Sequence, residues 1–83
     1  MLIHSPAELA EFTRDHRKGL HFSQTEVSDR VGLRQETVSG FENKPDSTKL
    51  ATLFKLLSAL DLELHIVPKS AVSQFRQGWD QEW

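Results

Sequence analysis

The sequence predicts a mainly α-helical fold, with four short helices around one hydrophobic core and a single short β-strand near the C-terminus. Apolar residues recur every three or four positions in four segments, and residues that favour helix ends lie between these segments. After residue 61 the apolar period changes to that of a strand. With 83 residues and no cysteine, the chain is predicted to be one small domain without disulfides.

The first helix is predicted to begin after Ser5. Ser5 is a favourable N-cap, Pro6 suits the first helical position, and Glu8 completes a capping box. Gly19 ends the helix. The inner face is predicted to hold Leu9, Phe12, Thr13 and His16. No second histidine or carboxylate is placed to share a metal ion with His16, which favours a histidine at the edge of the core over a metal ligand.

Residues 23–43 predict two short helices joined by a tight turn at Gly32. Ser23 and Glu26 form a second capping box, and Gly32 supplies the left-handed conformation that ends a helix. The inner stripe of the earlier helix consists of Val27 and Val31.

The later helix, from about residue 34 to residue 43, has two unlike faces. Val38 and Phe41 fall together on the inner face. Arg34 is a poor N-cap, and Gly40 costs about 1 kcal/mol inside a helix. The opposite face gathers Gln35, Glu36, Ser39 and Gly40. Because local rules are broken on the outward face, we expect that this face was selected for contact with a partner.

A loop from Asn43 to Ser47 is predicted to end by capping the fourth helix. The apolar stripe of that helix is the strongest in the chain, and it is expected to close the core. It consists of Leu50, Leu53, Phe54, Leu57 and Leu60.

The segment 62–68 is predicted to be a dimerisation strand that ends at Pro68. Leu62, Leu64 and Ile66 alternate with Glu63, His65 and Val67. The backbone of this strand needs a partner, and the only local candidate, residues 2–4, is short. Pairing with the same strand of a second copy would satisfy these backbone hydrogen-bonding groups and would relate the two copies by a two-fold axis. The sequence therefore predicts a homodimer.

These elements divide the chain into a helical domain (1–61), the strand (62–68) and a flexible C-terminal tail (69–83). The tail carries Trp79 and Trp83. Two interpretations remain open: Trp79 packs back on the domain, or both tryptophans anchor a partner protein.

The outward face of residues 34–40 suits the major groove of DNA, where glutamine pairs with adenine and arginine with guanine. The predicted base contacts are Arg34, Gln35, Glu36, Ser39 and Gly40. The predicted phosphate contacts are Ser23, Gln24, Thr37, Lys44 and Ser47. The net charge of −2 argues mildly against nucleic-acid binding, but two copies acting together compensate for a weak single site.

The stretch SQTEVSDRVGLRQETVSGFEN resembles the phage-repressor (Cro/cI, or XRE) helix-turn-helix family, and residues 5–60 fit its compact four-helix core. This resemblance implies a semi-buried salt bridge between Arg17 and Glu42. Where the family usually has alanine, this chain has Ser28, which adds one buried hydroxyl.

A narrower resemblance covers nearly the whole chain. The patterns S-P-x-x-L-A, S-x-F-E-N-x-P-D-x-T-x-L and L-L-x-x-L-x-L-x-L, with the terminal E-W, are similar to HipB antitoxins. That family implies a dimer closed by an intermolecular strand pair, which binds a pseudo-palindromic double-stranded operator and represses its own operon. It also implies a HipA-like serine/threonine kinase toxin that contacts Trp83. A split or shortened toxin remains open, because the tail between Pro68 and Gln81 does not match the family well. Such an antitoxin is expected in the bacterial cytoplasm, on the nucleoid when bound to DNA.

Two alternatives share the fold. The chain is either a stand-alone regulator without a toxin, or an interaction module that no longer binds DNA. We do not expect an enzyme, a cofactor or a metal site, because the sequence contains no recognisable nucleophile–base pair or set of metal ligands.

Overall fold

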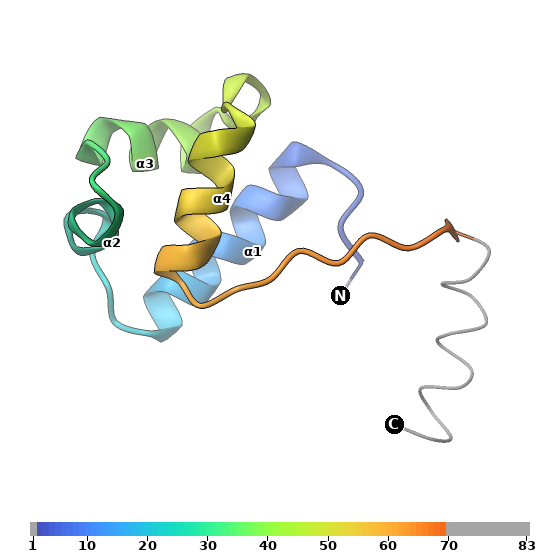
Figure 1. The fold of residues 1–83 in the computed structure, drawn as a ribbon, viewed down its shortest axis with the longest axis horizontal. Coiled ribbons are helices and arrows are strands. Elements are labelled where there is room, and N and C mark those ends of the chain that lie inside the picture. The colour runs from blue at the N-terminus through green and yellow to red at the C-terminus, as the bar shows by residue number, and fades with distance from the viewer. Residues whose placement is uncertain (1, 70–83) are drawn as a thin grey trace.

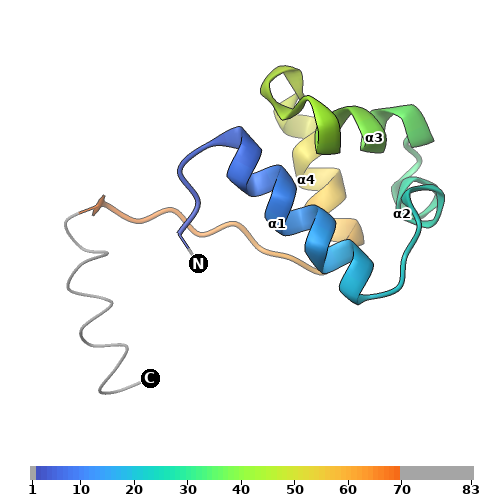
Figure 2. The same ribbon diagram turned by 180° about the vertical axis from the view of Figure 1, so that it is seen from behind.

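The computed structural model describes residues 2–69, and they form four α-helices with one 3₁₀ turn. The elements are α1 (Pro6–Gly19), α2 (Gln24–Val31), α3 (Gln35–Asn43), η1 (Pro45–Ser47) and α4 (Leu50–Ala59). Figure 1 shows α3 across one end of the bundle, α4 crossing in front of α1, and α2 end-on beside them. Figure 2 shows the same arrangement from behind, with α1 nearest. The predicted mainly α-helical fold with four helices is confirmed. Within the described residues, no helix is long and apolar enough to cross a membrane.

Helix α1 begins as its sequence predicts. The Ser5 hydroxyl accepts a hydrogen bond from the Glu8 backbone N–H at 3.1 Å, and Pro6 occupies the first turn. The Glu8 carboxylate reaches one residue further back than a standard capping box requires, and it accepts from the backbone N–H of His4 at 2.9 Å. The last helical residue is Gly19, and His21 then adopts a left-handed conformation with φ 62°.

The inner face of α1 is partly the predicted one. Thr13 is buried, whereas Leu9, Phe12 and His16 are only half-buried. The His16 ring stacks on Phe12 and its Nε2 lies 3.1 Å from the backbone oxygen of Leu60. This is the edge-of-core histidine that was predicted. Helical spacing did not predict the burial of Ala10 or of Arg17, and only the family resemblance implied it for Arg17.

Helix α2 has the predicted capping box and the predicted end. The Ser23 backbone N–H donates to the Glu26 carboxylate at 2.9 Å, and the Glu26 backbone N–H donates to the Ser23 hydroxyl at 3.0 Å. Hydrogen bonds from Ser23, first of all from its backbone N–H, hold the pKa of the Glu26 carboxyl below its usual range. Their stabilisation is therefore present above the ordinary pKa of glutamate and is lost as the pH falls through the lowered value. The extra hydroxyl of Ser28 is buried, and it donates to the backbone oxygen of Thr25 at 2.8 Å.

Helix α4 differs from the prediction at its exposed side and at its start. Leu53, Leu57 and Leu60 are buried as expected, but the side chains of Leu50 and Phe54 are 70% and 54% exposed. The buried face of α4 is therefore offset from the predicted five-residue stripe, because α4 packs against α2 along a face that buries two other residues instead. These two are Leu56 and Ala59.

The capping prediction for Ser47 is wrong. Pro45 starts the 3₁₀ turn η1, and Ser47 lies inside it. The helix therefore starts later, with Lys49 at the N-cap position and no side-chain hydrogen bond there.

Residues 62–68 follow α4 without regular secondary structure, and no strand is present among residues 2–69. Leu62 packs against the core, while the residues that follow are exposed. Residues 2–4 do not pair with this segment. The predicted partner strand belongs to a second copy, so the pairing stays a prediction. The tail from residue 70, with Trp79 and Trp83, lies outside the described residues.

Two identical substitutions on α4 test this assignment of its faces. Leu56→Ala should lower the free energy of unfolding by about 2–5 kcal/mol, since it empties a fully packed position. Leu50→Ala should change it by no more than about 0.5 kcal/mol, because Leu50 is largely exposed. Urea denaturation followed by circular dichroism measures both, and similar losses would contradict the observed burial.

Candidate nucleic-acid interface

Helix α3 separates an apolar face from a polar one. Val38 and Phe41 are 1% and 4% exposed and belong to the core. The N-cap residue Arg34 has an extended backbone and makes no side-chain cap. The outward residues Arg34, Gln35, Glu36 and Gly40 are exposed, and Ser39 is partly exposed. All five predicted base-contact residues therefore lie on or beside one accessible helix face.

Gly40 lies in the middle of this face. A Cβ atom added to Gly40 would meet nothing within 4 Å. Packing among residues 2–69 therefore does not require a glycine there, although glycine costs about 1 kcal/mol relative to alanine in a helix. Its absence of a side chain leaves space for an external surface to approach the helix backbone.

The turn between α2 and α3 fixes the angle at which α3 is presented. Gly32 adopts φ 67°, a conformation that favours glycine. The backbone N–H groups of Gly32 and Leu33 both donate to the Ser28 oxygen, and Leu33 packs against the core. This closed turn, together with the packing of α2 on α3, holds the two helices as one unit.

A nearly buried ion pair ties the far end of α3 to α1. The guanidinium of Arg17 donates from Nε and Nη2 to the two carboxylate oxygens of Glu42, at 2.7 and 3.0 Å. Their side chains are only 10% and 6% exposed. Arg17 Nη1 also donates to the backbone oxygen of Phe22 at 2.8 Å, so the same side chain holds the loop between α1 and α2. The salt bridge implied by the family resemblance is present.

The ion pair continues outward as a chain of side-chain hydrogen bonds. Gln24 Nε2 donates to Glu42 Oε1 at 3.0 Å, and Gln35 Nε2 donates to Gln24 Oε1. The amide of the exposed Gln35 is thereby oriented by two residues that connect it to the core. This connection does not follow from the sequence, in which Gln24 and Glu42 have separate predicted roles. Gln24 reaches both Gln35 at the start of α3 and Glu42 near its end only because α2 packs along α3.

The predicted phosphate contacts lie in two places. Ser23 and Gln24 stand at the N-terminus of α2, where Ser23 already accepts a hydrogen bond from Glu26. The other three, Thr37, Lys44 and Ser47, line a hollow of about 420 Å³ between α3, η1 and α4. The hollow is completed by Gly40, Phe41, Thr48, Lys49 and Thr52. Sequence reasoning missed Thr48, Lys49 and Thr52. The run of hydroxyl and lysine residues before α4 is the sequence signal for Thr48 and Lys49, whereas Thr52 lies inside α4 and has none.

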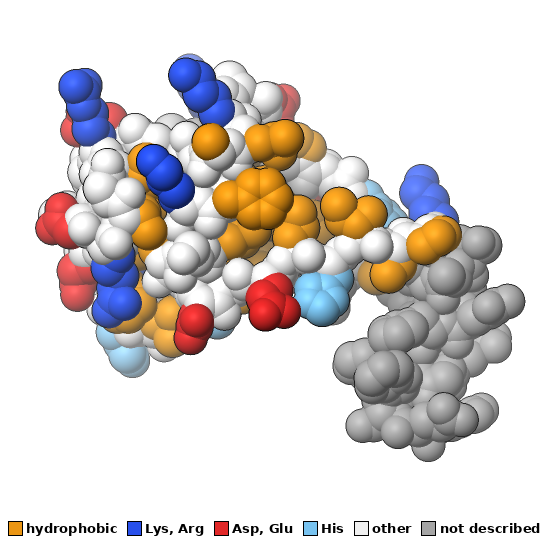
Figure 3. Space-filling model, in the orientation of Figure 1, with side chains coloured by type: hydrophobic (Ala, Val, Ile, Leu, Met, Phe, Trp, Pro, Cys, Tyr) orange, Lys and Arg blue, Asp and Glu red, His pale blue; other side chains and the backbone are white. Residues whose placement is uncertain are grey.

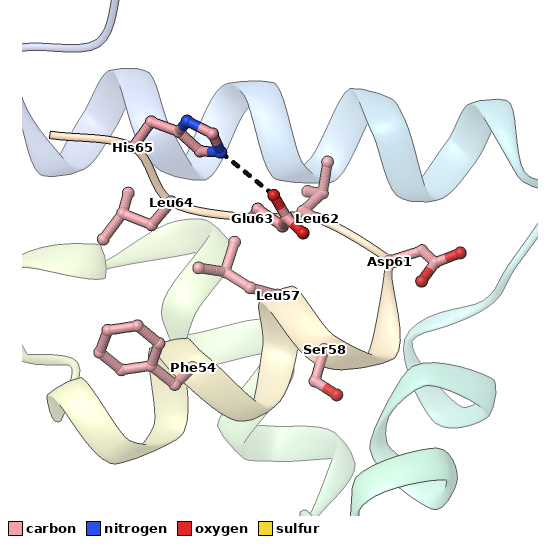
Figure 4. A pocket seen from close by; sticks show the side chains of 8 residues that line it. All are labelled: Phe54, Leu57, Ser58, Asp61, Leu62, Glu63, Leu64 and His65. Atoms are coloured by element: carbon pink, nitrogen blue, oxygen red, sulfur yellow. Dashed lines mark hydrogen bonds and ion pairs between the residues drawn. The ribbon is translucent and has the colours of Figure 1, made fainter.

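A second surface is apolar and lies on α4. Figure 3 shows hydrophobic side chains gathered over α4 and the chain that follows it, while most Lys and Arg side chains lie toward α2 and α3. A hollow of about 860 Å³ opens in this patch. Figure 4 shows the residues that line it: Phe54, Leu57, Ser58, Asp61, Leu62, Glu63, Leu64 and His65. Of the predicted dimerisation residues, Leu62 and Leu64 border the hollow, and Ile66 lies beyond it with 87% of its surface exposed.

No group of three side chains that could hold a metal ion occurs in the part of the chain from residue 2 to residue 69.

The comparisons with known proteins agree on one family. Residues 14–67 match the helix-turn-helix family. Antitoxin HipB of Escherichia coli strain CFT073 is 37% identical over 82 residues, which cover 98% of this chain and 87% of the relative. Antitoxin HipB of E. coli K12 is 35% identical, with 98% and 93% covered. Antitoxin HigA1 of Mycobacterium tuberculosis is 51% identical, but only over 61% of this chain and 34% of its own length.

Solved structures of HipB have the same fold as this chain. A HipB–O4 20mer complex superposes with a TM-score of 0.81 and 36% identity, covering 83% of this chain and 97% of that one. A HipA–HipB–O2–O3 complex gives the same TM-score, identity and coverage.

A set of substitutions tests the Arg17–Glu42 ion pair. Glu42→Leu should lower the free energy of unfolding by about 3–5 kcal/mol, because it leaves the buried guanidinium of Arg17 without its counter-charge. Adding Arg17→Met should recover most of the loss. Glu36→Leu is the matched control on the exposed face, with an expected change within about 0.5 kcal/mol. Chemical denaturation measures all three, and a double variant no more stable than Glu42→Leu alone would count against a buried pair.

Proposed function

Since the chain belongs to the helix-turn-helix family, and within it to the HipB antitoxins, we propose that it is an antitoxin that binds operator DNA as a dimer and represses its own operon. The observation that carries this proposal is the outward face of α3. That face is polar and accessible, and the Gln24–Glu42–Arg17 chain of hydrogen bonds connects it to the core.

The α3 face enters the major groove. Gln35 uses one N–H to bind Gln24, and its second N–H and its carbonyl oxygen remain available for the paired contact that glutamine makes with adenine. Arg34 contacts guanine or a phosphate, and Glu36 accepts from a cytosine amino group. Ser39 touches a base edge, and Gly40 permits the close approach. Because the Gln35 side chain is already oriented in the free protein, it loses less conformational entropy when DNA binds.

Backbone contacts position this face. The N-terminus of α2, with Ser23 and Gln24, presents the positive end of the helix dipole to one phosphate. A second phosphate is held beside α3 by Thr37, Lys44 and Ser47, which line the hollow at η1. Contacts of this type set the position of the protein on DNA and carry no sequence information themselves.

Two copies are needed for tight binding. The chain has a formal net charge of −2, so a single copy gains little from releasing the counter-ions of DNA. A dimer paired through residues 62–68 carries two α3 helices related by two-fold symmetry. These helices read half-sites about one helical turn apart, or a multiple of it, in a pseudo-palindromic operator.

The toxin is a HipA-like serine/threonine kinase, whole or in a split or shortened form. In a solved HipA–HipB–O2–O3 complex, the similar chain is 36% identical to this one and is covered over 97% of its length. The tail residues Trp79 and Trp83 are the anchors that we assign to the toxin, since tryptophan dominates many protein interfaces. The chain itself is not an enzyme, and it acts in the bacterial cytoplasm at its operator on the nucleoid.

A stand-alone repressor without a toxin is the alternative. It shares the DNA-binding face and the dimer, so it differs only in the partner of the tail. Co-purification of a kinase-like protein encoded beside this chain separates the two functions.

The base-reading role of Gln35 can be tested directly. Gln35→Ala should weaken binding to the DNA upstream of its own gene by about 1–3 kcal/mol and relax the preference at one base position in each half-site. Fluorescence anisotropy with single-base operator variants at fixed salt measures both effects. Glu11→Ala, on the exposed side of α1, is the control and should bind as the wild type does. An unchanged base preference would show that Gln35 does not contact a base.

The tail is tested by deleting Gln81–Trp83. The shortened chain should bind the kinase toxin at least tenfold more weakly, because it loses an aromatic anchor of the kind that often contributes 2 kcal/mol or more, roughly, to an interface. Its affinity for the operator should stay within about twofold of the wild type. Isothermal titration with purified toxin and anisotropy with operator DNA give the two affinities, and loss of both would assign the tail a structural role.

A further inference from the structure

We propose that two copies of the chain pair through residues 62–67 in one antiparallel register, centred on Leu64, in which Glu63 of each copy lies opposite His65 of the other. This proposal rests on the proposed dimer and adds which residues meet in it. The surface through which the two copies would pair consists of the exposed Glu63–His65 pair, the apolar residues of the same segment and the hollow on α4.

Symmetry limits the registers that are available. Two identical strands related by a two-fold axis are antiparallel, and each residue of one copy lies opposite a residue at the same distance from the axis on the other. An axis between two residues would place apolar side chains opposite polar ones and mix the two faces of the ribbon. An axis through residue 63, 64 or 65 keeps Leu62, Leu64 and Ile66 together on one face.

Charge decides among these three registers. An axis through Glu63 places two glutamates opposite each other, and an axis through His65 pairs two histidines. An axis through Leu64 instead forms two Glu63–His65 contacts, one on each side of the axis. A glutamate carboxylate accepts a hydrogen bond from a histidine ring N–H that faces it across the strands, whereas two facing glutamates repel each other. The two side chains already lie together within one chain, with His65 Nε2 3.1 Å from Glu63 Oε2.

The apolar side chains support the same register. Ile66 is 87% exposed in a single chain, and Phe54 and Leu64 are 54% and 43% exposed. Figure 4 shows Leu64 on the side of the hollow formed with Phe54 and Leu57. With the axis at Leu64, Ile66 of the second copy lies opposite Leu62, which borders the same hollow. Each copy therefore places an exposed isoleucine beside Leu62 at the border of the hollow of the other.

The absence of cysteine makes the register directly measurable, because each single substitution introduces the only thiol in the chain. Leu64→Cys should form a disulfide-linked dimer rapidly, since the Cα atoms of facing residues lie about 4.5–5.5 Å apart and disulfides span about 4.4–6.8 Å. Glu63→Cys and His65→Cys should each cross-link poorly alone, because diagonal neighbours are about 7–8 Å apart. An equal mixture of these two variants should cross-link efficiently.

The reaction is run on the full-length chain under mild oxidation and followed by non-reducing electrophoresis and mass spectrometry. Asp29→Cys, exposed on α2, is the control for random collision. Preferential self-linking of Glu63→Cys or of His65→Cys would overturn the register and place the axis at that residue. Cross-linking of Leu64→Cys no faster than the control, in a chain that sedimentation shows to be dimeric, would also overturn it while leaving operator binding untouched. A chain that is monomeric at all concentrations would overturn the proposed dimer itself.

A charge exchange provides a second measurement that keeps Leu64. His65→Glu should raise the dimer dissociation constant about tenfold, because it places two glutamate pairs face to face. Adding Glu63→His to that variant should restore the constant to within about twofold of the wild type, since each glutamate again faces a histidine that can donate a hydrogen bond to it. Analytical ultracentrifugation gives the constants. A double variant that dimerises as weakly as His65→Glu would overturn the cross-strand pairing.

Discussion

The position of helix α3 depends on the ion pair between Arg17 and Glu42. One guanidinium binds the carboxylate at the end of α3 through two nitrogens and the backbone of the loop before α2 through a third. Both side chains are nearly buried, so the attraction between them is largely offset by the loss of hydration. The pair therefore contributes more to geometry than to net stability: it is satisfied only when α1, the loop and α3 lie in one arrangement.

This constraint explains how α3 can carry a surface that is poor for a helix by itself. The helix lacks a side-chain N-cap and contains Gly40, and both features weaken a short helix in isolation. Two core residues and the Glu42 ion pair hold it from the inside instead. Its outward side chains need not stabilise the fold, and Gln24 extends the constraint from Glu42 to Gln35. The fold thus supplies a rigid support, and the exposed residues are available for recognition.

Much of the fold follows from local rules in the sequence. Ser5, Ser23 and Gly32 predicted where α1 begins and where α2 begins and ends, because caps depend on residues that are adjacent in the chain. The errors arise where a contact depends on distant segments. Periodicity placed Leu50 and Phe54 in the core, although it cannot distinguish a face covered within one chain from a face left open.

The candidate site shows the same division. The outward residues of α3 could be assigned from helical spacing, since their exposure follows from the burial of Val38 and Phe41. The Gln24–Gln35 hydrogen bond and the contribution of Lys49 to the hollow at η1 could not, because both arise from the packing of separate helices.

The exposed pair at positions 63 and 65 has a consequence for cells that contain several related regulators. In the register centred on Leu64, a paralogue with histidine at position 63 and glutamate at position 65 would form stable dimers with itself. A mixed dimer would bring glutamate against glutamate on one side and histidine against histidine on the other, and would be disfavoured. Two positions away from the outward face of α3 are then enough to insulate one regulatory circuit from another. Chains with near-identical recognition helices could diverge in the genes that they control without exchanging subunits.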